Sequence, residues 1–221
     1  MCGRFGFIPR TYFPKRFGIQ EKLPEIKPHF NITPGMQMPI IIKNSPNSVV
    51  MMRWGFIPFW AKDPKIGYKM INARVETLAE KPSFRKSLSS KRCLVPASLF
   101  YEWDHVGKIK IPYCIELKDL EMFAFAGLYD EWKDAEGYLL KTFTIITTNA
   151  NSLITKIHSR MPVILNEKDE NIWLDKNISD IPKLLSLLQP YDSSEMKMFP
   201  ISKDVNNPDN DNENIIKPLP I

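Results

Sequence analysis

The second residue of the chain is a cysteine, and its position gives it unusual chemistry. Once Met1 is removed, Cys2 carries an α-amine and a thiol on adjacent carbons. An α-amine has a pKa of about 7.7–8.0 against about 10.4 for lysine, so roughly one in ten is neutral at pH 7. Such an amine forms a Schiff base with an aldehyde, and the thiol closes it into a thiazolidine. The position predicts an exposed aldehyde-trapping aminothiol; a cysteine there by chance is the alternative.

Three more side chains have types suited to proton transfer or to holding a reacting oxygen. His158 follows a short amphipathic stretch, and histidine, with an ordinary pKa of about 6.5, exchanges protons near neutral pH. Glu102 stands between two aromatic residues, either on the solvent face of a strand or as a desolvated acid or base. Asn72 could donate an amide hydrogen bond and Arg74 could contact a phosphate. A packed histidine and a solvent-facing glutamate are the alternatives.

The positive charge is concentrated in one part of the sequence. The whole chain has 30 Lys and Arg against 25 Asp and Glu, a formal charge of +5, which indicates a polyanionic partner. Between Arg53 and Arg92 there are ten basic and three acidic residues, with six aromatic residues among them. Cations that follow phosphates and rings that stack on bases are what a groove for single-stranded nucleic acid needs. The alternative is a solvated helix face with core aromatics.

Length and composition limit the class of protein. A chain of 221 residues with 43% hydrophobic and 25% charged residues is expected to form one folded domain. Three cysteines without a CxxC or Cys/His cluster indicate neither disulfides nor zinc, and a reducing cytoplasm. The first residues contain charge and proline without an apolar run, so no signal peptide is expected, and no stretch is long enough to span a membrane. The polar stretch 203–221 is expected to be a loosely held tail.

Nineteen prolines divide the chain into short segments and exclude long helices from its first half. Runs of β-branched and aromatic residues predict strands at Pro39–Lys43, Val49–Trp54, Arg92–Pro96, Leu99–Trp103, Pro112–Leu117, Met122–Tyr129 and Leu140–Thr148. Helices are predicted at Thr77–Ser89, Ser152–His158, Glu167–Asp175 and Ile181–Leu188. The pattern predicts an α+β domain with a mainly antiparallel sheet or barrel and peripheral helices. No glycine-rich phosphate loop follows a strand, which disfavours a nucleotide-binding fold.

Eight motifs occur in an order that resembles one protein family. They are Met1-Cys2-Gly3-Arg4-Phe5, Asn31-Ile32-Thr33-Pro34, Arg53-Trp54-Gly55-Phe56-Ile57-Pro58 with Trp60-Ala61, Asn72-Ala73-Arg74-Val75-Glu76-Thr77, Phe84-Arg85, Arg92-Cys93-Leu94-Val95-Pro96, Phe100-Tyr101-Glu102-Trp103 and His158-Ser159-Arg160-Met161-Pro162-Val163. Together they resemble the SRAP family, the SOS-response-associated peptidases or abasic-site processing proteins. The resemblance runs from residue 2 to about 205, which predicts a SRAP domain at 2–205 and a polar C-terminal tail at 206–221.

The resemblance implies a fold, a partner and a reaction. It implies a β-barrel-like core with a positively charged groove that binds single-stranded DNA containing abasic sites, in the DNA damage response. The N-terminal cysteine forms a covalent thiazolidine with the ring-opened sugar, and the protein removes its own first methionine. No heptad or exposed apolar stripe indicates an obligate dimer, so a monomer is expected, in the cytoplasm and associated with the nucleoid. No cofactor, metal, nucleotide or membrane partner is expected.

The motifs also carry over individual residues. Cys2 is the expected nucleophile, Asn72 orients the linkage, and Glu102 and His158 transfer protons. The expected DNA contacts are Arg4, Trp60, Arg74, Arg85 and Arg160.

Two departures from the family's pattern and two rival functions stand beside this interpretation. Asn31-Ile32-Thr33-Pro34 replaces the usual Asn-x-Ala-Pro, and Gly127-Leu128-Tyr129 replaces Gly-Leu-Trp, which affects the details of the groove. An N-terminal-nucleophile amidotransferase also matures to a cysteine at position 2, but it needs an Asn-Gly turn that this sequence lacks. A non-catalytic module for single-stranded DNA is the other rival; it predicts that loss of Cys2 leaves all activity intact.

Overall fold

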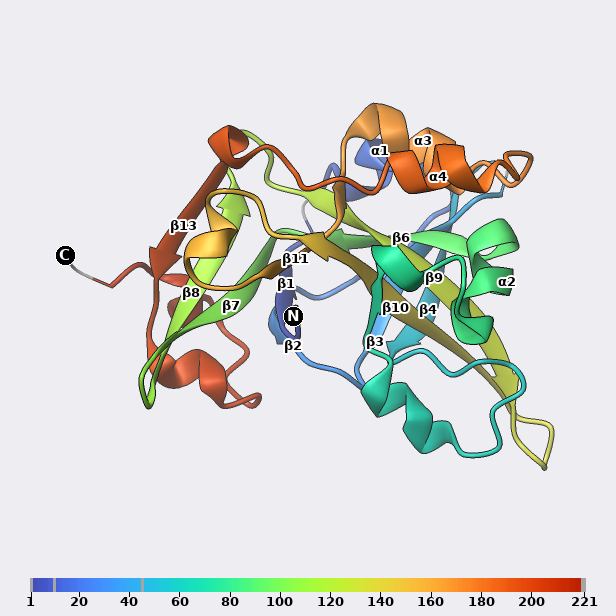
Figure 1. The fold of residues 1–221 in the computed structure, drawn as a ribbon, viewed down its shortest axis with the longest axis horizontal. Helices are drawn as coiled ribbons and strands as arrows, with labels where there is room; N and C mark the ends of the chain where they lie inside the picture. The colour runs from blue at the N-terminus through green and yellow to red at the C-terminus, as the bar shows by residue number, and fades with distance from the viewer. Residues whose placement is uncertain (1, 10, 45, 220–221) are drawn as a thin grey trace.

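A closed β-barrel of five strands forms the larger half of the molecule (Figure 1). The computed structural model describes residues 2–9, 11–44 and 46–219. The barrel strands, in spatial order, are β10 (Leu139–Asn149), β4 (Ser48–Trp54), β3 (Gln37–Ile42), β6 (Arg92–Ala97) and β9 (Phe123–Lys133). It closes because β9 pairs with β10, and all neighbouring pairs are antiparallel except β4 with β10. β5 (Asn72–Arg74), β11 (Arg160–Pro162) and β12 (Ile164–Leu165) extend this sheet.

A second sheet of five antiparallel strands lies beside the barrel (Figure 1). Its order is β13 (Met196–Pro200), β8 (Ile109–Leu117), β7 (Leu99–Val106), β1 (Phe5–Phe7) and β2 (His29–Ile32). Aromatic side chains join the two sheets: Phe5 packs edge-on against Trp54 and Phe125 with ring centroids 5.1 and 5.8 Å away. β1 begins three residues after Cys2, and these contacts hold it against the barrel.

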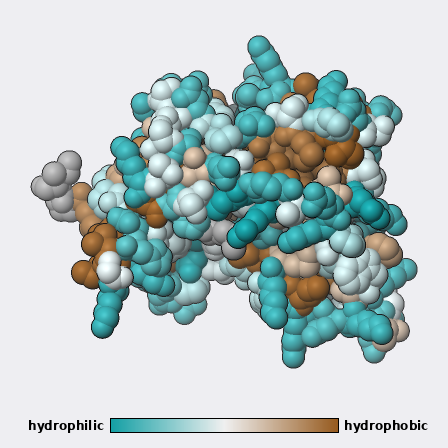
Figure 2. Space-filling model, in the orientation of Figure 1, coloured by the Kyte–Doolittle hydropathy of each residue, from teal (hydrophilic) through white to brown (hydrophobic). Residues whose placement is uncertain are grey.

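Short helices cover the outside of the barrel (Figure 1). They are α1 (Phe13–Arg16), α2 (Pro82–Ser90), α3 (Glu167–Leu174) and α4 (Ile181–Ser186), and α2 and α3 pack against β6 and β9. The 3-10 turns are η1 (Pro64–Lys69), η2 (Val75–Thr77), η3 (Ile154–Lys156), η4 (Ser193–Glu195), η5 (Lys203–Asn206) and η6 (Glu213–Ile216). The face in view is mostly hydrophilic, with separate apolar patches (Figure 2). In the described part of the chain, no helix has the length and apolar character to cross a bilayer.

The predicted fold class is confirmed, and all seven predicted strands are present within a few residues. The helices at 167–175 and 181–188 are also confirmed, but two helix predictions need correction. The helix predicted at Thr77–Ser89 begins only at Pro82, because proline lacks an N–H and fits the first turn of a helix, not its interior. The segment Ser152–His158 forms a single 3-10 turn at Ile154–Lys156. The Asn151 side chain accepts the Leu153 and Ile154 N–H groups where the turn begins, and the chain enters β11 soon after it ends.

The prediction of a loosely held C-terminal tail is wrong. Val205 and Ile215 are buried in a small apolar cluster with Leu99 and Tyr101 of β7. Val205 and Ile215 are ten positions apart in a polar stretch, so they gave little periodic signal, but in the folded protein both are buried against the second sheet. The boundary at residues 205 and 206 stays a prediction, because the turn that starts at Lys203 continues across it.

Candidate functional site

Cys2 lies directly before β1, and its side chain is fully buried. Its Sγ donates a weak hydrogen bond to the Arg4 carbonyl oxygen at 3.8 Å. The prediction that Cys2 is exposed is therefore wrong for the chain that begins with Met1. β1 lies between β7 and β2 in its sheet, so the residue directly before it is covered as well. Burial, followed by the negative charge of Glu102, raises the pKa of the Cys2 thiol far above its ordinary value. Met1, whose removal was predicted, lies outside the described residues.

Glu102 is a buried carboxylate on β7, next to the start of the chain. β7 pairs with β1 through Phe5 and Phe100, and the Tyr101 N–H donates to the Arg4 carbonyl at 3.1 Å. This register continues toward Cys2 and brings Glu102 beside it. Glu102 is only 3% exposed, so the solvent-face alternative is excluded. Burial raises the pKa of Glu102, and the charge of nearby His158 offsets part of that effect. A raised pKa lets a carboxyl group keep its proton to higher pH than an ordinary glutamate does, which suits a proton donor.

His158 follows η3 and is held by the backbone of Arg160. The Arg160 N–H lies 2.9 Å from Nδ1, and the Arg160 carbonyl oxygen lies 3.0 Å from the same atom. The first contact suits a neutral ring with its proton on Nε2, and the second suits a ring protonated on Nδ1. The two backbone groups of Arg160 therefore hold the ring in one orientation, which suits a group that transfers protons.

A pocket of about 410 Å³ brings three of the predicted residues together. Its lining residues are Arg4, Glu102, Trp103, His105, Lys110, His158 and Asn206. Trp103, His105, Lys110 and Asn206 are not among the site residues predicted from the sequence. Trp103 belongs to a quoted motif, and His105 and Lys110 are cross-strand partners on the β7–β8 hairpin, which alternation along both strands could have indicated. No sequence pattern indicated Asn206, because it lies in the polar C-terminal stretch, outside the eight motifs.

Asn72 lies on β5, which pairs with β10 through Ile145, and it does not line this pocket. Its Nδ2 donates to the Ile71 carbonyl at 3.0 Å. Its Oδ1 is buried, and no hydrogen-bond partner for it is found within the described residues. A buried polar atom without a partner costs free energy and often marks a ligand position.

The arginines predicted to contact DNA fall into two groups. Arg74 and Arg85 are exposed. Arg4 and Arg160 use their guanidinium groups inside the protein. Arg160 pairs with Glu76 and donates to the Thr147 carbonyl at 2.6 Å, while Arg4 donates to Asn31 Oδ1 and to the Val205 carbonyl, both at 2.7 Å. A DNA contact by Arg4 or Arg160 would add to these bonds or replace them.

The aromatic residues of the basic segment also divide. Trp54, Phe56 and Phe84 are core residues, whereas Phe59, Trp60 and Tyr68 are 51%, 50% and 63% exposed. Lys86 lies over the Phe59 ring at 4.4 Å, and Arg53 lies over the Tyr68 ring at 5.7 Å. Rings and cations therefore alternate on the surface here, as the charge pattern predicted.

The loop that presents Phe59 and Trp60 is held at three points by the barrel. Thr142 Oγ1 accepts from the Ile57 N–H at 2.9 Å, and Asp130 Oδ2 accepts from the Phe59 N–H at 2.9 Å. Trp132 Nε1 donates to the Ala61 carbonyl at 2.7 Å. We name residues 57–61 the aromatic loop. The backbone that carries the two exposed rings is thus held by the barrel before any partner binds.

The fold and this site define a single-domain β-barrel protein with an amino-terminal cysteine beside a buried carboxylate. Over residues 1–208 the sequence matches the family described as "SOS response associated peptidase (SRAP)", and the chain belongs to this family. The resemblance drawn from the eight motifs is thereby confirmed.

Known proteins similar to this chain cover nearly all of it. "Abasic site processing protein YoqW" of Bacillus subtilis (strain 168) is 50% identical over 222 residues, 98% of this chain and 99% of that one. "Abasic site processing protein YMR114C" of Saccharomyces cerevisiae is 35% identical, over 87% of this chain and 53% of that one. A crystal structure of a protein from Bacteroides thetaiotaomicron superposes with a TM-score of 0.91 at 33% identity, over 99% of this chain and all of that one.

Proposed function

We propose that this protein processes abasic sites: it binds single-stranded DNA that carries one and, after loss of Met1, forms a covalent thiazolidine crosslink through Cys2. The crosslink shields the lesion during the DNA damage (SOS) response. The names of the similar proteins support the abasic site as substrate. The observation that carries the reaction is the position of Glu102, buried beside Cys2 in a pocket shared with His158 and Arg4.

The proposed reaction balances with water as its only by-product. The α-amine of Cys2 adds to the aldehyde carbon of the ring-opened sugar, and the resulting carbinolamine loses hydroxide as water to give an imine. The thiol sulfur then adds to the imine carbon, and its proton goes to the nitrogen. Glu102, which holds its proton more tightly than usual, donates to the leaving hydroxyl, and His158 moves the proton during ring opening and reversal. The free amide oxygen of Asn72 orients the linkage.

Removal of Met1 comes before this reaction. In the unprocessed chain the Cys2 nitrogen is acylated by Met1, so no amine exists, and the thiol is buried and protonated. Addition of one water to the Met1–Cys2 peptide bond releases methionine and creates the aminothiol. We propose that the protein performs this hydrolysis on itself, as a thiol autopeptidase.

The same proposal includes the setting of the reaction. The protein acts as a monomer in the cytoplasm, on DNA of the nucleoid, as a lyase-type enzyme without a cofactor. Because the lesion has no base, the surface needs to read phosphates and stacking and not base identity.

The decisive experiment incubates protein of verified N-terminal mass with single-stranded DNA carrying one abasic site. We expect an adduct that survives denaturant and has the summed mass less one water. Cys2→Ser should give only a hydrolysable imine, and DNA with a reduced abasic site, which has no aldehyde, should give nothing. A full yield of stable adduct from Cys2→Ser, or from protein that retains Met1, would refute the thiazolidine.

A further inference from the structure

Residues 201–217, which we name the C-terminal segment, lie across the second sheet, in red beside β7 and β8 in Figure 1. Ile201, Val205 and Ile215 are buried against Leu99 and Tyr101. Ile201 forms a β-bridge with Pro218, which closes the segment into a loop. Burial of three apolar side chains stabilises this arrangement, so the segment is a built part of the domain.

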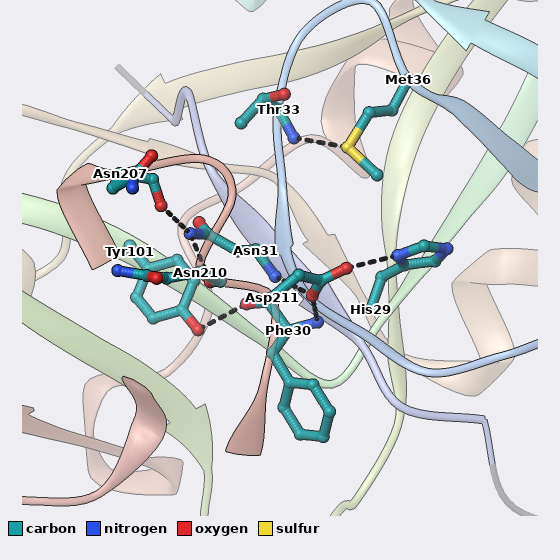
Figure 3. A network of polar contacts seen from close by, with 9 residues as sticks. All are labelled: His29, Phe30, Asn31, Thr33, Met36, Tyr101, Asn207, Asn210 and Asp211. Atoms are coloured by element: carbon teal, nitrogen blue, oxygen red, sulfur yellow. Dashed lines mark hydrogen bonds and ion pairs between the residues drawn. The ribbon is translucent and has the colours of Figure 1, made fainter. Parts of the chain in front are cut away.

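Asn31 at the end of β2 holds the first half of the C-terminal segment (Figure 3). It is 1% exposed, and its Nδ2 lies 3.2, 3.0 and 2.9 Å from the carbonyl oxygens of Val205, Asn207 and Asn210. One amide group thus contacts three carbonyls of the segment. The Val205 carbonyl also accepts from Arg4 and the Asn207 carbonyl from the Asn210 N–H, so Asn31 adds to the bonds that hold the segment in place. This gives a function to the Asn-Ile-Thr-Pro motif, which the proposed reaction does not use.

Asp211 holds the second half of the segment (Figure 3). Its Oδ1 accepts from the backbone N–H groups of Phe30 and Asn31, and its Oδ2 lies 2.7 Å from His29 Nδ1. β2 is the edge strand of the second sheet, and an uncovered edge strand leaves its N–H groups without partners. The C-terminal segment therefore closes this edge.

Arg4 and Trp103 connect the C-terminal segment to the pocket. Arg4 donates to Asn31 Oδ1 and to the Val205 carbonyl, each at 2.7 Å. Trp103 Nε1 donates to Asn206 Oδ1 at 2.8 Å, and the Arg4 guanidinium lies 5.9 Å from the centre of the Trp103 ring. Arg4, Trp103 and Asn206 all line the pocket that contains Glu102 and His158.

We propose that the C-terminal segment is one wall of the abasic-DNA site and that Asn31 and Asn206 are positioning residues within it. Asn31 fixes Arg4, and Asn206 fixes the plane of the Trp103 indole. Arg4 and Trp103 then contact the sugar-phosphate backbone in a single orientation. No rotamer change is needed during the short time in which the sugar ring is open. This inference rests on the proposed function, and it adds to the site Asn31 and the distant Asn206, which lies about 100 positions from Glu102 and about 200 from Cys2 in the sequence.

The test measures the rate of adduct formation at saturating abasic DNA for Asn206→Ala. Asn206 is exposed and its side chain holds Trp103, so the variant should keep the melting temperature of the parent. We expect the rate to fall about fivefold, the effect of one lost hydrogen bond of ~1 kcal/mol. Asn214→Ala is the matched control: it removes an exposed asparagine of the same segment that bonds Lys217 and does not line the pocket, and it should react at the parent rate.

A double-mutant cycle separates positioning from a general structural role. Trp103→Phe keeps a ring and removes the N–H, so Asn206→Ala should have no further effect on the rate in that background. Equal effects of Asn206→Ala in both backgrounds would overturn the assignment of Asn206.

Asn31→Asp tests the other positioning residue. The variant keeps an oxygen that accepts from Arg4, but it replaces the Nδ2 donor with a carboxylate oxygen. That oxygen repels the three carbonyl oxygens of the C-terminal segment, so the segment should detach. We expect faster hydrogen exchange at residues 201–217 together with a rate at least tenfold lower. Detachment with an unchanged rate would refute the wall, as would an unchanged rate for Asn206→Ala. If instead the parent protein forms no adduct at all, the proposed function itself fails.

Discussion

At the scale of single residues, burial of the Glu102 carboxyl group in the site lowers the stability of the folded protein at neutral pH. Burial raises the pKa of Glu102, so the folded protein favours the neutral acid. As pH rises above the ordinary carboxyl pKa of about 4.3, the unfolded chain releases this proton more readily than the folded one, and the folded state loses stability. The loss grows until the pH passes the raised pKa.

Glu102→Gln should therefore make the protein more stable and less active. At pH 4 the melting temperature should match the parent, and by pH 7 it should be higher by about 2–4 °C, the shift that ~1 kcal/mol produces in a chain of this size. Thermal unfolding between pH 4 and 8 measures this, with the exposed Glu80→Gln as the matched charge control. A variant less stable than the parent at pH 7 would contradict a raised pKa for this buried carboxyl group.

His158 gives a kinetic prediction. Since its ring is held in one orientation beside Glu102, His158→Ala should slow adduct formation or reversal by about 10²-fold, the usual contribution of a positioned proton-transfer group. Single-turnover kinetics at several pH values measures both directions. A variant with parent rates at every pH would make His158 a packing residue and nothing more.

At the scale of elements, the aromatic loop illustrates preorganisation. Gly55 starts the approach to it with a φ of +124°, and a Cβ there would lie 2.9 Å from the Gly67 carbonyl oxygen, so only glycine fits. Asp130, Thr142 and Trp132 then fix the loop from the barrel wall. A partner that stacks on Trp60 meets a ring whose backbone is already ordered, which reduces the entropy lost on binding.

Trp132→Phe removes the hydrogen bond to Ala61 and keeps an aromatic ring in the wall. We expect the affinity for undamaged single-stranded DNA to fall about threefold to tenfold, because one fixed point of the loop is lost. Fluorescence anisotropy with a labelled oligonucleotide measures the affinity. Trp173→Phe, which removes an indole bond to the Cys93 carbonyl far along the chain, is the control and should bind as the parent does. Equal losses in both variants would indicate a general loss of stability instead.

At the scale of the whole molecule, the charge of the segment 53–92 is presented by the barrel and its covering helix. Arg74 is the last residue of β5, Arg85 lies on α2, and both side chains are exposed. Binding of a polyanion to such a surface releases counterions. The logarithm of the affinity therefore falls linearly with the logarithm of the salt concentration.

The salt dependence of binding should report single cations of this surface. In a Cys2→Ala background, which binds without reacting, Arg85→Ala should reduce the slope of log affinity against log salt by about 0.7. Lys176→Ala removes the same charge from an exposed position outside the basic segment and should leave the slope unchanged. Should both variants change the slope equally, the protein would be responding to net charge and not to a defined groove.

The sequence by itself determined the long strands of the barrel and of the β7–β8 hairpin, the fold class and the family, because these depend on local patterns. Short strands such as β1, β2 and β5 were not predicted from it. Runs of β-branched and aromatic residues between prolines fix strands such as β10, and the eight motifs identify the family residue by residue. The acidic first turn of α3 marks that helix just as directly. Each of these signals lies within about ten residues.

Only the tertiary structure decided burial and partnership at the site. The same motif letters left Glu102 either exposed or desolvated, and only the pairing of β7 with β1 places it beside Cys2. Asn31 meets Val205 across 174 positions, and Asn206 meets Trp103 across 103. Such contacts depend on the free energy of closing long loops and covering a particular sheet face, which no local pattern encodes.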